Sequence, residues 1–544
     1  QQTFPSSEGG GGRGGGNKQG EGSSRGRAIV LGGGPYSIGS SVEFDWCCVQ
    51  AAHELQRQGY SVSMINSNPE TVSTDYDECD ALFFEELSDE RVRDIAERLR
   101  PEGLVVSMGG QIPNSLARKL AAVDIPLFGT AALDIDRAED RHKFSSFLDE
   151  IGVDQPEWKE FADVTVAQEF CEKVGYPVIV RPSYVLSGAA MAVVHSGKDL
   201  SAFLEQASLV SKDSPVVISK FEQGAKEIDF DGVAQEGKLL LYAFSEHVEN
   251  AGVHSGDATM VLPAQRVNLA TLRQLKVIAK KISAGLRISG PFNIQFLAKN
   301  NRLKVIECNV RASRSFPFCS KVTGQNFAVL ATQALLRRAP PDKRYQTVDL
   351  DHVAVKAAQF SFGRLKGADP RLGVEMASTG EVACFGLNAE QALLTALVAV
   401  GFKLPKKSIL LTVGKLEDKM EILPAVQALH AKGFAFFATL RTHEFLLSRG
   451  IPSALLHKVS EPRSPNIREY LEQKRIDLVI NIPTHSTVDE QTDGYFIRRI
   501  ATDQGVSLLT NVQLVKRVVE ALIQEDITKL PLMRWPDLLE GVGI

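Results

Sequence analysis

Apolar residues follow two rhythms along the chain: short runs, which predict strands, and longer stretches with a period near 3.6, which predict helices. The first region, residues 27–135, alternates the two. Its expected elements are a strand at 28–31, a Gly-rich turn at 32–34, a helix ending near residue 57, strands at 61–65 and 104–108, and a helix from about residue 113. This alternation favours a small parallel α/β domain.

Strand pairs dominate the second region, residues 136–402, after two expected helices at 140–151 and 165–174. Its expected strands are at 177–181, 190–195, 215–220, 227–234 and 238–245. A hairpin around residue 300 and a final helix at 325–337 are expected to follow. Paired neighbouring strands favour antiparallel sheets and an α+β body. Pro340-Pro341 marks a joint, and residues 352–400 are expected to complete the same domain.

The strand and helix rhythm restarts after a second joint at residues 401–407, which predicts a separate parallel α/β domain over 403–530. Its expected strands are at 408–413, 434–438, 477–481 and 506–509, and its helices at 418–431, 441–449, 491–504 and 511–523. Residues 531–544 are expected to form a tail. Residues 1–26 are rich in Gly, Ser and Gln and indicate a disordered linker.

Two apolar strands around Asn300-Asn301-Arg302 carry the most informative polar residues of the chain. Side chains alternate faces along a strand, so Glu307, Asn309 and Arg311 are expected to share one face. A three-residue loop would set Gln295 opposite Glu307, whereas an even-numbered loop would turn Gln295 to the wrong face. One carboxylate and two amide oxygens suit Mg²⁺, with Arg311 balancing the charge of a phosphoryl group. The alternative is a solvated hairpin edge.

Charged residues at strand and helix ends predict further contacts to a nucleotide. Arg181 ends an apolar strand and precedes a loop of small, hydroxyl-bearing residues, 182–190, that would let a phosphate approach the backbone. Arg141 begins a helix and could supply a second cation, or else only a surface ion pair. In the turn from Lys220 to Glu227, the candidates for contacts to adenine and ribose are Glu222 and Glu227, and a plain surface turn is the alternative.

Two glycine-containing segments complete the candidates. The segment from Glu246 to Asp257 holds two imidazoles, three acids and two glycines, without the histidine and cysteine spacing typical of zinc. An ordinary polar loop is its alternative interpretation. The turn Gly32-Gly-Gly-Pro lacks the dinucleotide and phosphate-loop fingerprints, so it indicates either an anion contact or only a tight strand-to-helix turn.

Composition and charge exclude several classes of protein. With 44% apolar and 23% charged residues the chain is typical of a globular protein, and its net charge of −5 with dispersed basic residues argues against a nucleic-acid partner. No apolar run reaches the ~20 residues that a membrane span needs. The seven cysteines form no CxxC pair and are expected to be reduced thiols of an intracellular protein.

Several of these segments resemble one known family. They are residues 32–46, 68–77, 181–188, 215–221, 246–257, 307–314 and 375–383. Together they resemble the carboxyl-terminal half of the carbamoyl phosphate synthetase large chain, nearest to its eukaryotic pyrimidine-pathway type, over essentially residues 27–520. The resemblance implies a pre-ATP-grasp domain over 27–135, an ATP-grasp domain over 136–402 and a regulatory domain of the methylglyoxal synthase type over 403–530.

The family's carboxyl-terminal half phosphorylates carbamate with ATP and two Mg²⁺ or Mn²⁺ ions, and the resemblance implies this activity here. The residues that would hold ATP are Arg141, Arg181, Lys220, Glu222, Glu227, Gly252, Val253, His254, Ser255, Gln295 and Glu307. The metal ligands would be Gln295, Glu307 and Asn309. Arg311 and Arg314 would steady the phosphoryl group and carbamate as the catalytic pair, in agreement with phosphoryl transfer by positioning and charge neutralisation.

The last domain resembles the family's effector-binding domain. Thr439, Thr442, Lys458 and Asn481 match positions of a phosphate-binding pocket, for which a uridine nucleotide is the natural effector. Thr484 and Gly494 replace asparagines of the urea-cycle relatives, which argues against acetylglutamate. A purely structural cap is the alternative.

The resemblance also implies parts that this sequence lacks, namely the half that makes carboxyphosphate and a glutaminase that supplies ammonia. It further implies pyrimidine, or else arginine or urea, biosynthesis by an oligomer in the cytoplasm, with mitochondria as the alternative. Two rival interpretations stay open. One is another ATP-grasp ligase that joins a carboxylate to an amine, and the other is a non-catalytic nucleotide-sensing subunit.

Overall fold

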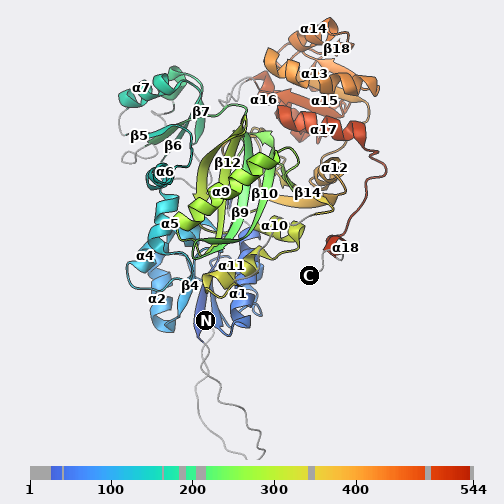
Figure 1. Ribbon diagram of the computed structural model, residues 1–544. Helices are drawn as coiled ribbons and strands as arrows, with labels where there is room; N and C mark the ends of the chain where they lie inside the picture. Colours follow the sequence, from blue (N-terminus) through green and yellow to red (C-terminus); the bar gives the residue numbers. More distant parts are fainter. Residues whose placement is uncertain are drawn as a thin grey trace, which may run out of the picture.

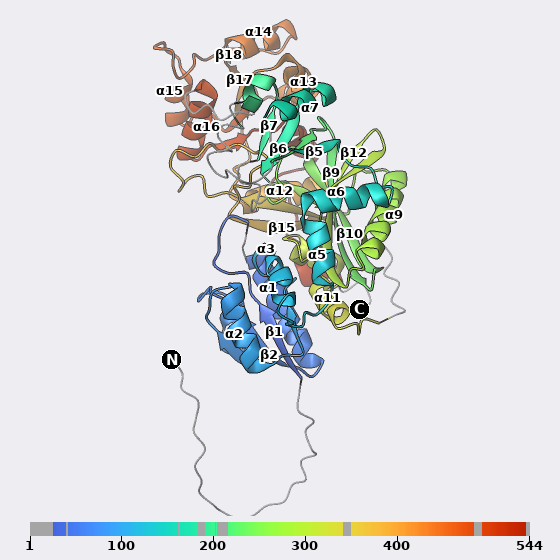
Figure 2. The same cartoon turned by 90° about the vertical axis from the view of Figure 1, so that its left-hand side faces the viewer.

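The computed structural model describes residues 26–39, 42–161, 164–182, 191–201, 203, 216–340, 350–483 and 492–539. Several sequence predictions fall on positions outside the described residues. They are the linker up to residue 25, the loop 183–190, Thr484, the first residue of the helix at 491–504 and the end of the tail, 540–544. Figures 1 and 2 show a blue amino-terminal domain, a large central sheet with a smaller one beside it, and an orange and red domain at the opposite end.

The amino-terminal domain is the expected parallel α/β unit. Its four strands lie in the order β3-β2-β1-β4, and β1 pairs in parallel with both β2 and β4. The strands are β1 Arg27–Leu31, β2 Ser61–Ile65, β3 Ala81–Phe83 and β4 Gly103–Val105. The helices are α1 Val42–Arg57, α2 Asp89–Leu99, α3 Gln111–Ser115 and α4 Ala117–Ala121, with a 3₁₀ turn η1 at Val72–Thr74. Ser88 caps α2, and Arg100 ends it in the left-handed conformation.

A small antiparallel sheet follows, with strand order β5-β8-β6-β7. Its strands are β5 Trp158–Phe161, β6 Val178–Pro182, β7 Ala192–Val194 and β8 Val216–Lys220. The neighbouring helices are α5 Ala132–Glu139, α6 Arg141–Glu150 and α7 Val164–Val174. This sheet and α7 form a separate core around Cys171 and Ile218, both fully buried, so they make a distinct subdomain.

The large central sheet is antiparallel throughout, with strand order β13-β12-β9-β10-β11-β14-β15. Its strands are β9 Lys226–Gln235, β10 Lys238–Asn250, β11 Met260–Leu262, β12 Gly290–Lys299, β13 Arg302–Asn309, β14 Val353–Gln359 and β15 Gly380–Gly386. Its helices are α9 Leu269–Gly285, α10 Phe316–Thr323, α11 Phe327–Leu335 and α12 Ala389–Ala399. Residues after 352 therefore do complete this body, as predicted.

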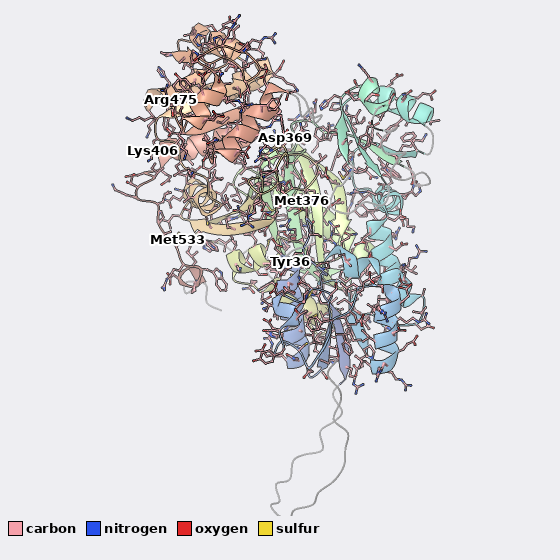
Figure 3. All side chains as sticks on the ribbon, turned by 180° about the vertical axis from the view of Figure 1, so that it is seen from behind. Tyr36, Asp369, Met376, Lys406, Arg475 and Met533 are labelled. Carbon is pink, nitrogen blue, oxygen red and sulfur yellow. The ribbon has the colours of Figure 1, made fainter. Side chains whose placement is uncertain are left out.

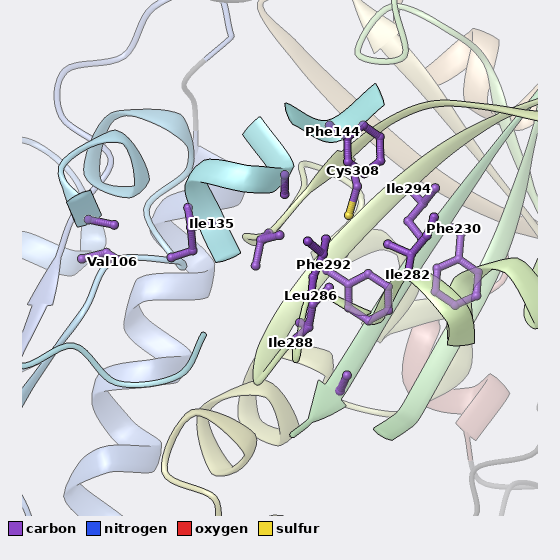
Figure 4. Close-up of a cluster of buried hydrophobic side chains, with 14 of the residues drawn as sticks. Val106, Ile135, Phe144, Phe230, Ile282, Leu286, Ile288, Phe292, Ile294 and Cys308 are labelled. Carbon is purple, nitrogen blue, oxygen red and sulfur yellow. The ribbon is translucent and has the colours of Figure 1, made fainter. Parts of the chain in front are cut away.

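One core joins the central sheet to the amino-terminal domain. Figure 4 shows the aromatic rings of Phe230 and Phe292 on the sheet, with Ile135 and Phe144 from α5 and α6 and Val106 from the first domain in the same cluster. All five are at most 4% exposed. Because this packing is continuous, groups from the first domain are held against the end of β13.

Strand β10 is longer than the sequence predicts. The polar residues after Ser245 indicated the start of a loop, but β10 continues to Asn250. His247 and Glu249 are at most 1% exposed, and both have buried polar partners, Asp229 on β9 and Thr259 just before β11. The alternative of an ordinary polar loop is therefore wrong for residues 246–250.

The hairpin of β12 and β13 keeps the expected pairing through an unexpected turn. Its loop holds only Asn300 and Asn301, both with positive φ, because Lys299 pairs directly with Arg302. The expectation of a three-residue loop is therefore wrong. A β-bulge between the pairs Phe296–Val305 and Gln295–Glu307 inserts Ile306 and restores the predicted opposition. An even-numbered turn and one extra residue together give the same register as an odd-numbered turn.

The last domain is a parallel sheet with strand order β18-β17-β16-β19-β20. Its strands are β16 Ser408–Val413, β17 Ala435–Ala438, β18 Ser453–Leu455, β19 Leu478–Ile482 and β20 Ser507–Leu509. Its helices are α13 Leu416–Ala431, α14 Leu440–Ser448, α15 Ile467–Glu472, α16 Asp493–Asp503 and α17 Val512–Gln524, and α18 Trp535–Leu539 follows. Helix α12 lies between β14 and α17, and one apolar core runs from Val355 through Leu393 to Val515 (Figure 1).

Candidate active site

The centre of the site is one row of residues across three strands. Glu307 on β13 pairs with Gln295 on β12, and Gln295 pairs in turn with Asp229 on β9. Directly paired residues of antiparallel strands lie on the same face, so three oxygen-bearing side chains form a line on one face of the sheet. The predicted opposition of Gln295 and Glu307 is confirmed by this register.

Glu307 is an ionised carboxylate held by positive charge. Arg141 donates from Nη2 to Oε2 of Glu307 at 2.7 Å, and Asn309 donates from Nδ2 to Oε1 at 3.1 Å. Burial alone would raise the pKa of Glu307, but the charges of Arg141 and Arg181 and the bond from Asn309 outweigh it and lower the pKa to about 2. The carboxylate is therefore available as a cation ligand at any physiological pH.

Two guanidinium groups converge on this one carboxylate. Arg141 is the first residue of α6, and its Nη1 also donates to the carbonyl of Ile306, the bulge residue, at 3.3 Å. Arg181, at the end of β6, has a buried Nε with no hydrogen-bond partner among the described residues. Burial and the neighbouring charge of Arg141 lower the pKa of Arg181 to about 9. The surplus positive charge and the unpartnered donor suit a polyphosphate.

The amide side chains of the cluster present oxygen as the remaining coordinating atom. Gln295 donates from Nε2 to the hydroxyl of Ser255 at 2.9 Å, and Asn309 uses its Nδ2 for Glu307. One carboxylate and two amide oxygens fit Mg²⁺ provided that phosphates complete the shell. No group of three or more His, Cys, Asp and Glu able to hold a metal occurs among the described residues.

The two candidate catalytic arginines reach into the amino-terminal domain. Arg311 donates from Nη2 to Oε1 of Gln111 at 2.9 Å and to Oδ1 of Asn309 at 3.2 Å. Arg314 donates from Nη2 to Oε1 of Glu43 at 3.1 Å. The Nε of Arg314 is buried without a hydrogen-bond partner among the described residues. The first domain therefore supplies acceptors that fix both guanidinium groups, and Arg311 lies beside the metal candidate Asn309.

The segment that follows β10 borders the cluster through Ser255, whose hydroxyl accepts from Gln295. Gly252 adopts a φ of +114°, which favours glycine, and Val253 is buried. The backbone N–H of His254 donates to the carbonyl of Gly373 at 2.7 Å, and Lys356 donates to the carbonyls of Ser255 and Gly256 at 3.3 Å. Burial lowers the pKa of His254 and favours its neutral form.

Lys220 and Glu222 make their hydrogen bonds outside the central cluster, whereas Glu227 lies two residues from Asp229 on β9 and near enough to Arg181 and Glu307 for their charges to influence its pKa. Lys220 donates to the carbonyls of Gly175 and Tyr176 at 2.7 and 3.2 Å, and Glu222 accepts from Lys304 on β13 at 2.5 Å. Glu227 is 6% exposed, and burial raises its pKa to about 7 despite the opposing charge of His247. None of the three is hydrogen-bonded to Glu307 or Gln295 within the described part of the chain.

Sequence reasoning missed the buried partners of this row. His247 and Asp229 form a buried pair at 2.8 Å, and Asn293 donates to Asp231 at 2.9 Å. Lys226 donates to the carbonyls of His247 and Val248 at 2.9 and 3.0 Å. The spacing of the acids at 227, 229 and 231 was a readable signal, because residues two apart on a strand share a face.

The predicted effector residues gather at the carboxyl ends of the last sheet. Thr439 follows β17, Lys458 lies just after β18, and Asn481 near the end of β19 donates to the hydroxyl of Thr412 at 2.7 Å. Thr442, in the first turn of α14, donates to the carbonyl of Val413 at 3.2 Å. Carboxyl edges of parallel sheets are typical ligand sites. Lys419, which the sequence did not single out, donates to the carbonyl of Arg441 at 3.2 Å and adds a cation there.

Three domain models match the chain in order. The carbamoyl phosphate synthase preATP-grasp domain matches residues 24–137, the carbamoyl-phosphate synthase L chain ATP-binding domain matches 140–336, and the MGS-like domain matches 421–510.

Curated relatives match nearly the whole chain. The chain is 52% identical over 505 residues to multifunctional protein pyr1-3 of Dictyostelium discoideum, and 51% identical over 503 residues to multifunctional protein URA2 of Saccharomyces cerevisiae, in each case over 91% of this chain. It is 47% identical over 503 residues to the mitochondrial carbamoyl-phosphate synthase [ammonia] of Mus musculus, again over 91% of this chain. It spans only 22%, 23% and 33%, respectively, of the length of these relatives.

Solved structures of low identity share the fold of the first two domains. N5-carboxyaminoimidazole ribonucleotide synthetase from Thermotoga maritima matches with a TM-score of 0.52 at 16% identity, over 69% of this chain and 97% of that one. The biotin carboxylase domain of 2-oxoglutarate carboxylase from Hydrogenobacter thermophilus matches with a TM-score of 0.55 at 13% identity, over 69% and 90%.

The central sheet, the small subdomain that faces it and the matched ATP-binding domain define the chain as an ATP-grasp protein. Within that class it belongs to the carbamoyl-phosphate synthase family, because the three matched domains and the relatives agree. The predicted domain classes and family are confirmed. No helix in the described ranges is both long and apolar enough to span a membrane.

Proposed function

We propose that this chain transfers the γ-phosphoryl group of ATP to carbamate and forms carbamoyl phosphate and ADP. The supporting observation is the opposition of Gln295 and Glu307, with Asn309 and two guanidinium groups around the same carboxylate. Phosphoryl transfer depends on positioning and charge neutralisation, and this cluster is built for both. The domain limits proposed above, at residues 135 and 402, stay part of this proposal.

Each group has a role in the proposed reaction. A carbamate oxygen forms the new bond to the γ-phosphorus, and the bond from that phosphorus to the bridging oxygen of ADP breaks. Mg²⁺ or Mn²⁺, in a pair of ions held by Gln295, Glu307 and Asn309, would supply positive charge between the phosphates. Arg141 and Arg181 would bind the polyphosphate, and Arg311 and Arg314 would hold the moving phosphoryl group and carbamate.

The remaining candidates complete the nucleotide site in the proposal. Lys220, Glu222 and Glu227 would hold the adenosine end, and the backbone from Gly252 to Ser255 would line the pocket. Burial raises the pKa of Glu227 to about 7, so about half of its carboxyl groups carry a proton at neutral pH and can donate as well as accept a hydrogen bond. The nucleotide would therefore lie between the small subdomain and the central sheet.

We further propose that the last domain binds a phosphorylated effector, with a uridine nucleotide as the natural candidate, through Thr439, Thr442, Lys458 and Asn481. The complete protein would contain the carboxyphosphate-forming half and a glutaminase, and would act as an oligomer in the cytoplasm in pyrimidine biosynthesis. The names of the multifunctional relatives and the MGS-like match support this wider assignment.

The reverse half-reaction tests the catalytic proposal. Purified chain is incubated with carbamoyl phosphate and MgADP, ATP formation is measured by luciferase, and UTP, UMP and phosphoribosyl pyrophosphate are titrated in turn. ATP formation that depends on carbamoyl phosphate supports the proposal. ADP formation with amino acids as acceptors, and none with carbamate, would favour the rival carboxylate–amine ligase, and binding of ATP without either reaction would favour a nucleotide sensor.

A further inference from the structure

The segment between β14 and β15, residues 360–379, is held at one end by the last domain. Asp369 accepts two hydrogen bonds from Arg498 of α16: Nε donates to Oδ1 at 2.6 Å, and Nη2 donates to Oδ2 at 2.5 Å. Arg499 donates to the carbonyls of Phe362 and Ala368 at 2.9 Å, and Tyr495 donates to that of Gly367 at 2.9 Å. Three neighbouring side chains of one helix therefore grip one segment of the preceding domain.

The same segment is held at its other end by the nucleotide site. The carbonyl of Gly373 accepts from the backbone N–H of His254 at 2.7 Å, and the sulfur of Met376 accepts from Nη1 of Arg314 at 3.2 Å. Asp257 accepts from the N–H groups of Ala377 and Ser378 at 2.9 and 3.0 Å. Figure 3 places Asp369 next to the orange and red domain and Met376 over the central sheet.

Arg498 also belongs to the candidate effector pocket. Its Nη1 donates to Oδ1 of Asn481 at 2.8 Å, while its Nε and Nη2 donate to Asp369. The side chains of Arg498 and Asp369 are 5% and 9% exposed. One guanidinium group thus joins a predicted effector residue to the segment that contacts His254 and Arg314.

Resting on the proposed function above, we infer that Arg498 and Asp369 are positioning residues that couple the effector pocket to the nucleotide site through residues 360–379. An anionic effector bound at Asn481 would draw on the same guanidinium group that holds Asp369. A change at Asp369 would then shift Gly373 and Met376, which lie four and seven residues further along. In a buried bidentate pair the geometry is closely defined, so a small displacement at one end is not absorbed by solvent.

The test measures binding, so that it is independent of turnover. The Kd of UTP for the full chain is determined with and without saturating MgADP, and the ratio of the two values is the coupling factor, which acts equally in both directions. In the native protein we expect a factor of about 5 or more. In Asp369→Asn the factor should fall below about 2, while MgADP alone binds within about 2-fold of its native Kd.

A matched control removes another ion pair across the same domain boundary. Glu520 of α17 binds Arg266 at 2.8 Å without touching residues 360–379, so Glu520→Gln should keep the native coupling factor. Amide hydrogen exchange of Asp369→Asn gives a second readout, because the His254 amide should exchange faster without ligand. Native coupling in Asp369→Asn would overturn the inference, as would failure of UTP, UMP and phosphoribosyl pyrophosphate all to bind. If the native chain shows the expected coupling factor, and Asp369→Asn loses it, but the native chain forms no ATP, only the catalytic proposal is overturned.

Discussion

Gln295 lies directly opposite Glu307 in the ladder of β12 and β13, although the turn that joins these strands contains only two residues. The bulge at Ile306 makes this possible and also presents a carbonyl to Arg141. One irregular residue thus sets the face of the carboxylate and fixes a cation beside it.

Replacement of the central carboxylate tests the proposed metal site. We expect Glu307→Gln to abolish ATP formation from carbamoyl phosphate and MgADP, because the neutral amide keeps the shape but loses the charge that attracts a divalent ion. A drop of at least about 100-fold in kcat is expected. Glu236→Gln is the control, since Glu236 is exposed at the turn between β9 and β10. Unchanged turnover in Glu307→Gln would contradict the metal assignment.

Removal of the first arginine of α6 tests the polyphosphate site. Arg141→Met should lower kcat/KM for MgADP by about 100-fold, because it deletes one cation and leaves Glu307 with less compensation. Arg137→Met, four residues earlier in α5, removes an ion pair with Glu150 and should change kcat/KM by less than about 2-fold. Equal effects of the two substitutions would indicate a general loss of structure instead.

The hairpin turn can be tested through its backbone. Asn300 has a φ of +51°, which Asn and Gly tolerate and a β-branched residue does not. Asn300→Val should lower the free energy of unfolding by about 1–2 kcal/mol, and Asn300→Gly should change it far less. Urea titrations monitored by fluorescence compare the pair. Equal midpoints would mean that another turn conformation is available.

The buried carboxyl group of Glu227 predicts a pH dependence of stability. Its pKa is raised from an ordinary 4.5 to about 7, so between these values the folded chain holds a proton that the unfolded chain has lost. Stability should therefore fall as pH rises across this window, by about 3 kcal/mol from this group. Glu227→Gln should flatten this part of the profile. Unfolding titrations at pH 5, 6 and 7 make the comparison, and identical slopes in both proteins would refute the assignment.

The sequence predicted most strands well because the pattern that specifies them is local. The strands at 61–65 and 408–413 were placed with their observed bounds, since each is a short segment with at least three apolar residues. The polar end of β10 was missed because His247 and Glu249 find buried partners, Asp229 and Thr259, at distant positions in the sequence, and such partners are invisible in a local pattern.

The candidate site was predicted in its side chains and only partly in its geometry. The alternation along β13 correctly put Glu307 and Asn309 on one face, but the bulge has no local signature, because Ile306 looks like any apolar strand residue. The bonds from Arg311 to Gln111 and from Arg498 to Asp369 join residues far apart in the sequence. They depend on how the domains pack, which no periodicity records.

The apolar core that runs from Val355 through Leu393 to Val515 has a practical consequence for protein engineers. A stop codon placed in the joint at 401–407 would expose apolar side chains that this core now buries and would promote aggregation, so truncation is a poor way to study the rest of the chain without its last domain. Single substitutions at the boundary are the cleaner tool, because they leave that shared interior closed.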